Sequence, residues 1–218
     1  MRGERMAKVL ITGPARGGTT LLLLLSHFFI NCRVCSDRER HPSEPHQSEA
    51  NVKHVIIKQP YGFYEEFTPK YLFKDLLEND WRIICIIRDP RDTLISFNEK
   101  EGKIGAHWCP PKSWIRTAKE LLANVWDSSL FALRYEDLVI DPDSIMSEVA
   151  SFLGVGLKEN FKEFYKTPLV NNWKTLNGAR PIDKNSIGRW KDEQHIGYLN
   201  EVITDEVKEL AFKLGYQL

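Results

Sequence analysis

The residues best suited to chemistry lie in one glycine-rich stretch near the start of the chain. Four residues separate Gly13 from Gly18, Arg16 lies between them, and Thr19 and Thr20 follow directly. Glycine lets backbone N–H groups approach a ligand closely, threonine hydroxyls add donors, and arginine adds a permanent positive charge. A strand-like apolar run precedes the stretch and a leucine run follows it, so its N–H groups would open a helix, where the dipole favours anions. The stretch therefore predicts a site for a phosphate-like group.

The same glycine spacing begins the P-loop of nucleotide triphosphatases, but one position argues against that motif. A P-loop requires lysine directly after the second glycine, where it reaches the β- and γ-phosphates. Thr19 occupies that position, and the only cation of the stretch is Arg16. We interpret the stretch as an anion-binding loop whose cation, Arg16, lies between the two glycines instead of directly after the second one. The alternative is an ordinary glycine turn between a strand and a helix.

Two further cations stand at the ends of predicted strands. Lys58 ends one apolar run and Arg88 follows another, with Ser96 eight residues later. The carboxyl ends of parallel strands meet at one edge of an α/β sheet, in the crevice where such sheets bind ligands. Both residues are therefore candidates for the anion site. Structural roles are also open, because Lys58 could extend its ammonium group to solvent and Arg88 could pair with a nearby aspartate.

These residues need a framework that brings them together, and the hydrophobic pattern indicates one. Apolar runs rich in β-branched residues alternate with segments of helical periodicity. Such alternation indicates parallel strands joined by right-handed helical crossovers. We predict a single α/β domain over residues 1–218, with helices flanking a central parallel sheet. The expected strands are 9–12, 54–58, 81–87 and 130–133, and the expected helices are 19–30, 71–77, 90–98, 114–126, 145–153, 158–165 and 204–214.

Composition narrows the classes of function. The chain has 30 Lys and Arg residues and 30 Asp and Glu residues, so its formal net charge is zero. Nucleic-acid binding needs a basic face, so we do not expect nucleic acid as the main partner. Any basic site must be local. A hydrophobic content of 42% argues against general disorder and is enough for a core.

The leucine run and the cysteines have simple interpretations. Residues 21–25 are too few to span a bilayer, and no small-residue cleavage site follows them. We therefore expect a cytoplasmic protein with neither a membrane span nor a signal peptide. Cys32 and Cys35 form an isolated Cys-x-x-Cys pair, without the second pair that a zinc site needs. Free thiols are expected.

Four motifs, taken in order, resemble those of the sulfotransferases that use 3′-phosphoadenosine 5′-phosphosulfate (PAPS). Residues 14–20, Pro-Ala-Arg-Gly-Gly-Thr-Thr, are similar to the 5′-phosphosulfate loop of the family, usually Pro-Lys-Ser-Gly-Thr-Thr. Residues 88–96 resemble its 3′-phosphate motif, with an arginine and a serine at the family spacing. Residues 135–138, Tyr-Glu-Asp-Leu, resemble the strand-end segment whose tyrosine helps to hold the adenine. Residues 187–191, Ile-Gly-Arg-Trp-Lys, resemble the C-terminal Gly-x-Trp-Lys segment that closes over the cofactor.

The resemblance implies a P-loop nucleotide-kinase-like fold and transfer of a sulfuryl group from PAPS to a hydroxyl or amine, which leaves adenosine 3′,5′-bisphosphate (PAP). It implies no metal, because the sulfuryl group carries less negative charge than a phosphoryl group and fixed cations suffice. The acceptor would be a small molecule, a sugar or a peptide, and residues 36–53 and 99–113 are expected to form its loops. Arg16 and Lys58 are the implied catalytic cations. The implied cofactor-binding residues are Arg16, Gly17, Gly18, Thr19, Thr20, Arg88, Ser96, Tyr135 and Lys184.

The sequence departs from the family pattern at three places. Arg16 and Gly17 replace the usual lysine and serine, Leu21 replaces a tryptophan that some members place beside the adenine, and Pro60 stands where the cytosolic small-molecule branch has its catalytic histidine. Glu65 is then the candidate base, as in branches that use a glutamate. A P-loop small-molecule kinase or phosphotransferase and a non-catalytic nucleotide-binding relative are the alternative functions. The sequence gives no indication of the oligomeric state.

Overall fold

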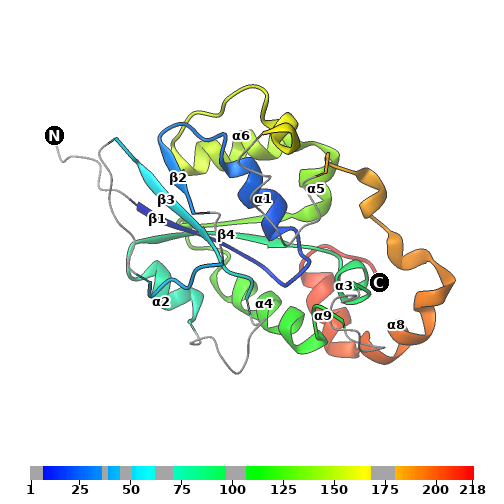
Figure 1. Cartoon of the computed structure of the whole chain (residues 1–218). Helices are drawn as coiled ribbons and strands as arrows, with labels where there is room; N and C mark the ends of the chain where they lie inside the picture. The colour runs from blue at the N-terminus through cyan, green and yellow to red at the C-terminus, as the bar shows by residue number, and fades with distance from the viewer. Residues whose placement is uncertain (1–6, 36–38, 45–50, 62–70, 97–106, 168–179) are drawn as a thin grey trace.

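A five-stranded sheet forms the centre of the computed structural model, which describes residues 7–35, 39–44, 51–61, 71–96, 107–167 and 180–218 (Figure 1). All neighbouring strands run parallel, so the predicted parallel α/β sheet is confirmed. Three strands are almost wholly buried, as expected when helices cover both faces of a sheet. The strand order is β2-β3-β1-β4-β5, with bounds β1 Ala7–Thr12, β2 Cys32–Val34, β3 His54–Lys58, β4 Trp81–Ile87 and β5 Leu130–Arg134.

Helices cover the two faces of the sheet in two layers (Figure 1). One apolar cluster joins α1, α5, α6 and the 3₁₀ helix η2 to β1 and β4, and the other joins α2, α4 and α9 to the opposite face. The leucines of α1 supply much of the first cluster, and Trp114 lies in the second with none of its surface exposed. The bounds are α1 Thr19–Ser26, α2 Phe73–Leu77, α4 Pro111–Asn124, α5 Tyr135–Ile140, α6 Pro142–Leu153, η2 Phe161–Lys166 and α9 Asp205–Lys213.

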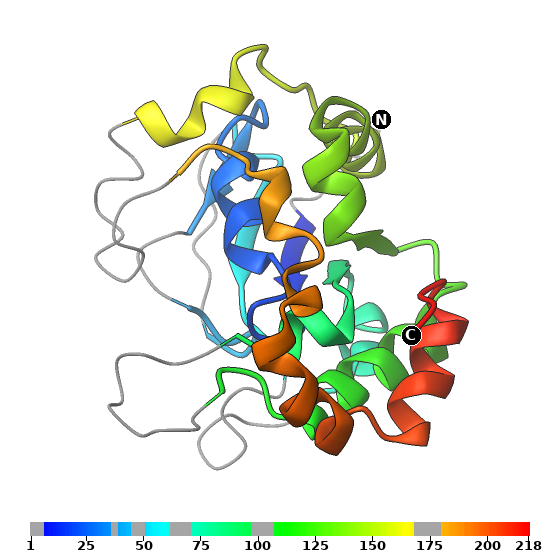
Figure 2. The same ribbon diagram turned by 90° about the vertical axis from the view of Figure 1, so that its right-hand side faces the viewer.

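The remaining short helices gather at the carboxyl edge of the sheet, together with the C-terminal region. Figure 2 shows residues 180–195, drawn in orange, running in front of α1 in that view. This edge is also where the sheet changes direction, because the chain builds β2 and β3 on one side of β1 and then crosses to β4 on the other. Ligands of α/β proteins bind at such switch points. The bounds are α3 Pro90–Leu94, η3 Lys184–Ser186, η4 Arg189–Lys191, η5 Glu193–His195 and α8 Ile196–Val202.

Several element bounds differ from the predicted ones. The edge strand β2 was not predicted, because three half-buried residues of mixed polarity carry no clear strand pattern. The helix α1 ends at Ser26 rather than residue 30, and Phe29 instead pairs with Leu157 in a short bridge. The predicted helix 158–165 is a 3₁₀ helix over Phe161–Lys166. None of the described helices combines the length and apolar character that crossing a bilayer requires.

The differences around α3 and α4 affect the site. Prediction placed Ser96 inside a helix from 90 to 98, but α3 ends at Leu94. The backbone N–H of Ser96 bonds to the Thr93 carbonyl, and its own carbonyl accepts from Trp108. Ser96 therefore lies in a turn after α3. The helix predicted at 114–126 is α4, which begins at Pro111, where proline suits a first helical position.

Candidate functional site

The glycine-rich loop joins β1 to α1 at the carboxyl edge of the sheet. Gly13 has φ 153° and Gly18 has φ 102°, and a Cβ atom at either would overlap a neighbour, the Ile86 carbonyl or the Tyr135 ring. Only glycine fits at these two positions. Helix α1 begins after Gly18 with no side-chain cap and no acidic residue in its first turn. Its N-terminal dipole is therefore not balanced by an anionic side chain of its own.

Arg16 joins the two predicted anion motifs within this loop. Its Nε donates to Ser96 Oγ over 2.8 Å, and its carbonyl accepts from Arg88 Nη1 over 3.3 Å. Arg16 has φ 66°, a left-handed backbone conformation that costs energy for a residue with a Cβ atom. The sequence predicted that these three residues share a crevice, and the fold places them in contact.

Arg88 is surrounded by polar and aromatic partners. Its Nη2 donates to the Ser186 carbonyl, its guanidinium lies 4.5 Å from the centre of the Tyr135 ring, and the Asp92 carboxylate is 3.7 Å away. The ion pair with an aspartate, which the sequence left open, is therefore present. Among the described residues Arg88 Nε is buried without a hydrogen-bond partner. A buried donor without a partner is unfavourable, and an anion in the crevice would satisfy it.

The backbone on either side of Arg88 is fixed by side chains from other elements. The Arg88 carbonyl accepts from Trp114 Nε1 over 3.1 Å, and the Asp89 N–H donates to the Glu136 carboxylate over 2.9 Å. The Asp89 side chain accepts from Arg91 N and so caps α3. This network holds the arginine in one position before any ligand arrives.

Asp92 holds residues 188–190 of the C-terminal region at the same edge of the sheet by hydrogen bonds. It is 3% exposed and accepts hydrogen bonds from Gly188 N over 2.7 Å and Trp190 N over 3.0 Å. Tyr135 Oη and Ser186 Oγ are 2.8 Å apart, which adds a second attachment. From the sequence, an aspartate here was expected at most to pair with Arg88, and Ser186 had no predicted role. The basic composition of 183–191 was the signal available for that segment.

Positive charge is concentrated here although the chain is neutral overall. Partial burial, and then repulsion from Arg88 and Arg189, lowers the pKa of Arg16, which keeps an exposed surface, and Arg180 acts in the same direction. A site whose cations repel one another is stabilised by a bound polyanion. In the described residues these arginines form a local cluster of positive charge.

Lys58 lies in the same region, at the end of β3. It is 2% exposed, so it does not extend to solvent as one interpretation proposed. Its Nζ donates to Thr20 Oγ1 over 3.1 Å and forms an ion pair with the Glu39 carboxylate at 2.8 Å. The first contact connects Lys58 to the start of α1, as the strand-end position predicted. Glu39 was missed, because the loop before β3 has no periodicity.

One predicted residue, Lys184, is not gathered at this site, and others lie outside the described residues. Lys184 is exposed in η3, and in the described part of the chain its side chain joins no hydrogen bond or ion pair. Glu65 lies outside the described residues. So do 36–38 and 45–50 of the first predicted acceptor loop and 99–106 of the second.

The cysteines match the expectation of free thiols. All four are unpaired with one another, and burial raises the pKa of the Cys32 thiol to about 11. Such a thiol stays protonated and is a poor nucleophile. Within the described ranges no cluster of three or more His, Cys, Asp or Glu residues has the arrangement of a metal site.

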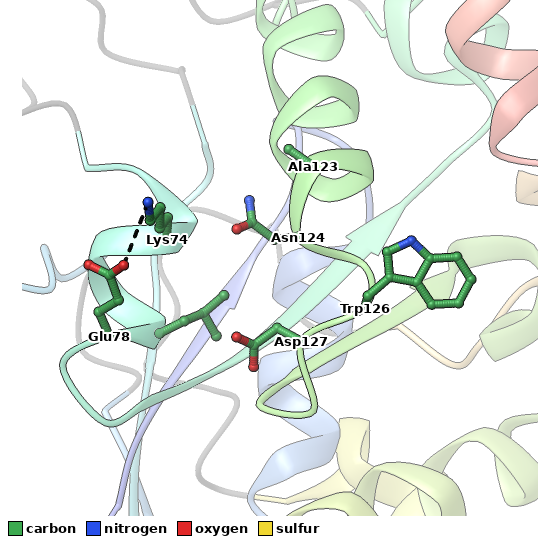
Figure 3. A pocket seen from close by; sticks show the side chains of 7 residues that line it. Lys74, Glu78, Ala123, Asn124, Trp126 and Asp127 are labelled. Atoms are coloured by element: carbon green, nitrogen blue, oxygen red, sulfur yellow. Dashed lines mark ion pairs between the residues drawn. The ribbon is translucent and has the colours of Figure 1, made fainter.

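A hollow of about 320 Å³ lies away from the basic crevice (Figure 3). Lys74 of α2 and Glu78, which follows that helix, line one side, and Asn124, Trp126 and Asp127 line the other. These residues precede β4 and β5, so the hollow is at the amino edge of the sheet. It contains none of the residues that the sequence marked as functional.

Comparison with known proteins identifies the family. The model of the sulfotransferase domain matches residues 6–211, nearly the whole chain. The chain belongs to the sulfotransferase domain family. The matched residues 6–211 include the glycine-rich loop, Arg88, Ser96 and the residues that bond to Asp92.

The chain has more distant similarity to individual proteins. It is 26% identical over 160 residues to the 3-beta-hydroxysteroid sulfotransferase of Cavia porcellus, a match over 59% of this chain and 56% of that protein. Matches of this kind span about half the length of the curated relatives. Among solved structures, the sulfotransferase domain from the curacin biosynthetic pathway has a TM-score of 0.70 at 16% identity, covering 99% of this chain and 100% of that chain. Mouse sulfotransferase SULT7A1 complexed with PAP has a TM-score of 0.59 at 14% identity, covering 98% of this chain and 90% of that chain.

Proposed function

We propose that this protein transfers a sulfuryl group from PAPS to a hydroxyl or amine acceptor. The observation that carries the proposal is the contact of the glycine-rich loop with the Arg88 motif, through Arg16 and Ser96. PAPS is anionic at two places, the 5′-phosphosulfate and the 3′-phosphate. A nucleotide of this kind matches a sheet edge that carries a helix N-terminus and the buried Nε donor of Arg88, which is unpartnered among the described residues.

The residues present fit this donor. We assign the 5′-phosphosulfate to the N–H groups and hydroxyls of Gly17 to Thr20, since α1 begins there without an acidic residue. We assign the 3′-phosphate to Arg88, whose Nε has no partner, and to Ser96. Tyr135, next to Gly18, would contact the adenosine. Lys184 is proposed as a further 3′-phosphate ligand only if η3 changes its side-chain orientation on binding, because that side chain is exposed.

The donor supplies the sulfuryl group, and the protein supplies fixed positive charge. Arg16 and Lys58 would stabilise the charge that grows on the departing phosphate, since both lie next to the start of α1. Arginine remains charged and so serves as an electrostatic group rather than a proton donor. The acceptor is proposed to be a small molecule. Mouse SULT7A1 and the curacin-pathway domain share this fold. The fold alone does not determine which acceptor is used.

Binding of nucleotides tests the donor. PAP should raise the melting temperature of the protein, because a ligand that binds only the folded state stabilises it by about 2.7 kcal/mol at 100 times its Kd. ATP with magnesium should not, since Thr19 replaces the lysine that a kinase P-loop needs. Stabilisation by ATP with magnesium and not by PAP would instead favour the phosphotransferase alternative.

Transfer of labelled sulfate tests the reaction. The protein is incubated with PAPS labelled in the sulfuryl group and with phenols, alcohols, sugars, amines and peptides in separate reactions. Formation of labelled product with at least one acceptor class is expected. Binding of PAP with no transfer to any class would favour the non-catalytic nucleotide-binding relative.

A further inference from the structure

Glu39 lies at the solvent end of a series of polar contacts that begins at the N-terminus of α1, the helix proposed to bind the anion. Its carboxylate contacts Lys58 Nζ at 2.8 Å, and Lys58 Nζ in turn donates to Thr20 Oγ1 at 3.1 Å. The Lys58 side chain is 3% exposed and that of Glu39 is 29% exposed. One end of this series of contacts therefore faces the start of α1, and the other end, Glu39, is accessible to solvent.

The backbone holds Glu39 in this position. Arg40 N donates to the Lys58 carbonyl over 3.0 Å, so the residue next to Glu39 is bonded to the strand end that carries Lys58. Earlier in the chain, β2 pairs with β3, and Cys35 N bonds to the Ile56 carbonyl. The segment that carries Glu39 is thus registered on β3 at two places. The Lys58 side chain is buried and needs a counter-charge, which the Glu39 carboxylate supplies from the more exposed side.

We propose that Glu39 is the catalytic residue that accepts the proton of the sulfate acceptor. This inference rests on the proposed function and names the base that the reaction needs. Glu39 and Thr20 both contact Lys58 Nζ, and Thr20 belongs to the place assigned to the sulfuryl group. An acceptor that enters from solvent therefore meets the Glu39 carboxylate close to that place. Glu44, the other carboxylate described on this segment, is already bonded to His41 N at 3.0 Å and paired with Arg40 at 3.7 Å.

The step balances in atoms and charge. The acceptor oxygen or nitrogen uses its lone pair to form a bond to sulfur, and the bond from sulfur to the 5′-phosphate oxygen breaks. The electron pair of the broken bond stays on that phosphate oxygen, where Lys58 and Arg16 offset the charge. The acceptor proton moves to the Glu39 carboxylate and leaves to solvent through its exposed side.

Glu39→Gln tests the proposal, because glutamine keeps the shape and can still accept a bond from Lys58. The assay uses the full-length protein and the acceptor that the wild-type enzyme modifies best among the five classes. We expect kcat to fall roughly 100-fold or more, as for loss of a general base. PAP affinity, measured by calorimetry, should stay unchanged or rise slightly, because a negative charge is removed beside an anion site.

A second acceptor distinguishes proton transfer to Glu39 from a role of Glu39 that only positions Lys58. An analogue whose attacking group is made more acidic by an electron-withdrawing substituent needs less help from a base. The loss caused by Glu39→Gln should therefore be smaller for the analogue than for the parent acceptor. Equal losses for both would overturn the proposal, since a group that only orients Lys58 acts alike on every acceptor.

Glu44→Gln is the matched control in the same segment. It should leave kcat within about three-fold of wild type, and an equal loss in both variants would mean that the segment, not the Glu39 carboxylate, is needed. Full activity of Glu39→Gln would overturn the inference and leave the proposed function intact. Failure of the wild-type protein to bind PAP or to transfer sulfate would remove the proposed function, and this inference with it.

Discussion

Arg16 and Ser96 are 80 residues apart in the chain, and Arg16 Nε donates a 2.8 Å hydrogen bond to Ser96 Oγ. If both residues contact one bound nucleotide, their contributions to its affinity are coupled. We expect Arg16→Ala and Ser96→Ala each to weaken PAP binding, with an interaction energy of about 0.5–3 kcal/mol in a double-mutant cycle. Calorimetric titration of the four proteins measures it. A cycle of Ser96→Ala with Lys119→Ala, an exposed lysine on α4, is the control and should be additive. Additivity of the Arg16 and Ser96 changes would contradict the shared site.

Arg88 should be the largest single contributor to PAP affinity. Its Nε is a buried donor without a partner among the described residues, and its Nη atoms lie against the loop and the C-terminal segment. Hydrogen bonds to charged groups contribute about 1.5–3 kcal/mol each. Arg88→Ala is expected to lose at least that much binding free energy, whereas Lys119→Ala should lose none. An unchanged Kd for Arg88→Ala would remove the 3′-phosphate assignment.

Lys58 should matter for turnover more than for binding. Its ammonium group is buried between Thr20 and Glu39, where it can offset charge that develops during transfer. Removing one such preorganised donor costs about 100-fold to 1000-fold in kcat. Lys58→Met keeps the apolar length of the side chain, and we expect this loss in kcat with a PAP affinity close to wild type. Lys8→Met at the opposite end of the sheet is the control. Equal losses of turnover and affinity would make Lys58 a binding group only.

Gly18 should tolerate no side chain. At φ 102° a Cβ atom is strained, and it would also overlap the Tyr135 ring. Gly18→Ala is expected to lower the free energy of unfolding by roughly 1–3 kcal/mol, measured by urea denaturation. Gly197→Ala is the matched control, because Gly197 lies in α8 and a Cβ there meets nothing within 4 Å. That variant should be neutral or more stable, since alanine is the better helix former. Similar effects of both changes would contradict the steric explanation.

His54 should make the fold less stable in acid. It is 2% exposed, Nε2 lies 2.7 Å from the Leu153 carbonyl, and burial lowers the pKa of the imidazole. The folded state therefore favours the neutral ring. This contribution is complete above the unfolded pKa of about 6.5 and is lost as the pH falls through that value toward the folded pKa.

Urea denaturation between pH 5 and pH 8 measures this effect. The wild-type unfolding free energy should fall with decreasing pH by up to about 1.4 kcal/mol per pH unit for each such histidine. His54→Gln should reduce the slope without abolishing it, because burial also lowers the pKa of His27 and His107. Identical slopes for both proteins would show that His54 is not the group responsible.

Much of the framework could be predicted because its signals are local. The β-branched runs of β1, β3 and β4 are buried on both faces, and this makes them apolar along their whole length. The helix expected at 145–153 is α6, which ends at Leu153, and Gly154 follows it with φ 67°, a conformation that glycine favours after a helix. The edge strand β2 has no such signal, since an edge strand is only partly buried and needs few apolar residues.

The candidate site likewise has one part that could be predicted from the sequence and another that could not. The sequence by itself determined that an anion loop, two strand-end cations and a basic C-terminal segment exist, because glycine spacing and strand ends are properties of neighbouring residues. Only the tertiary structure decided which side chains meet. Asp92 reaches Gly188 across 96 residues, and Glu39 reaches Lys58 across 19. Such pairs depend on strand order and on the direction in which each side chain leaves the backbone, and both are set when the whole sheet packs.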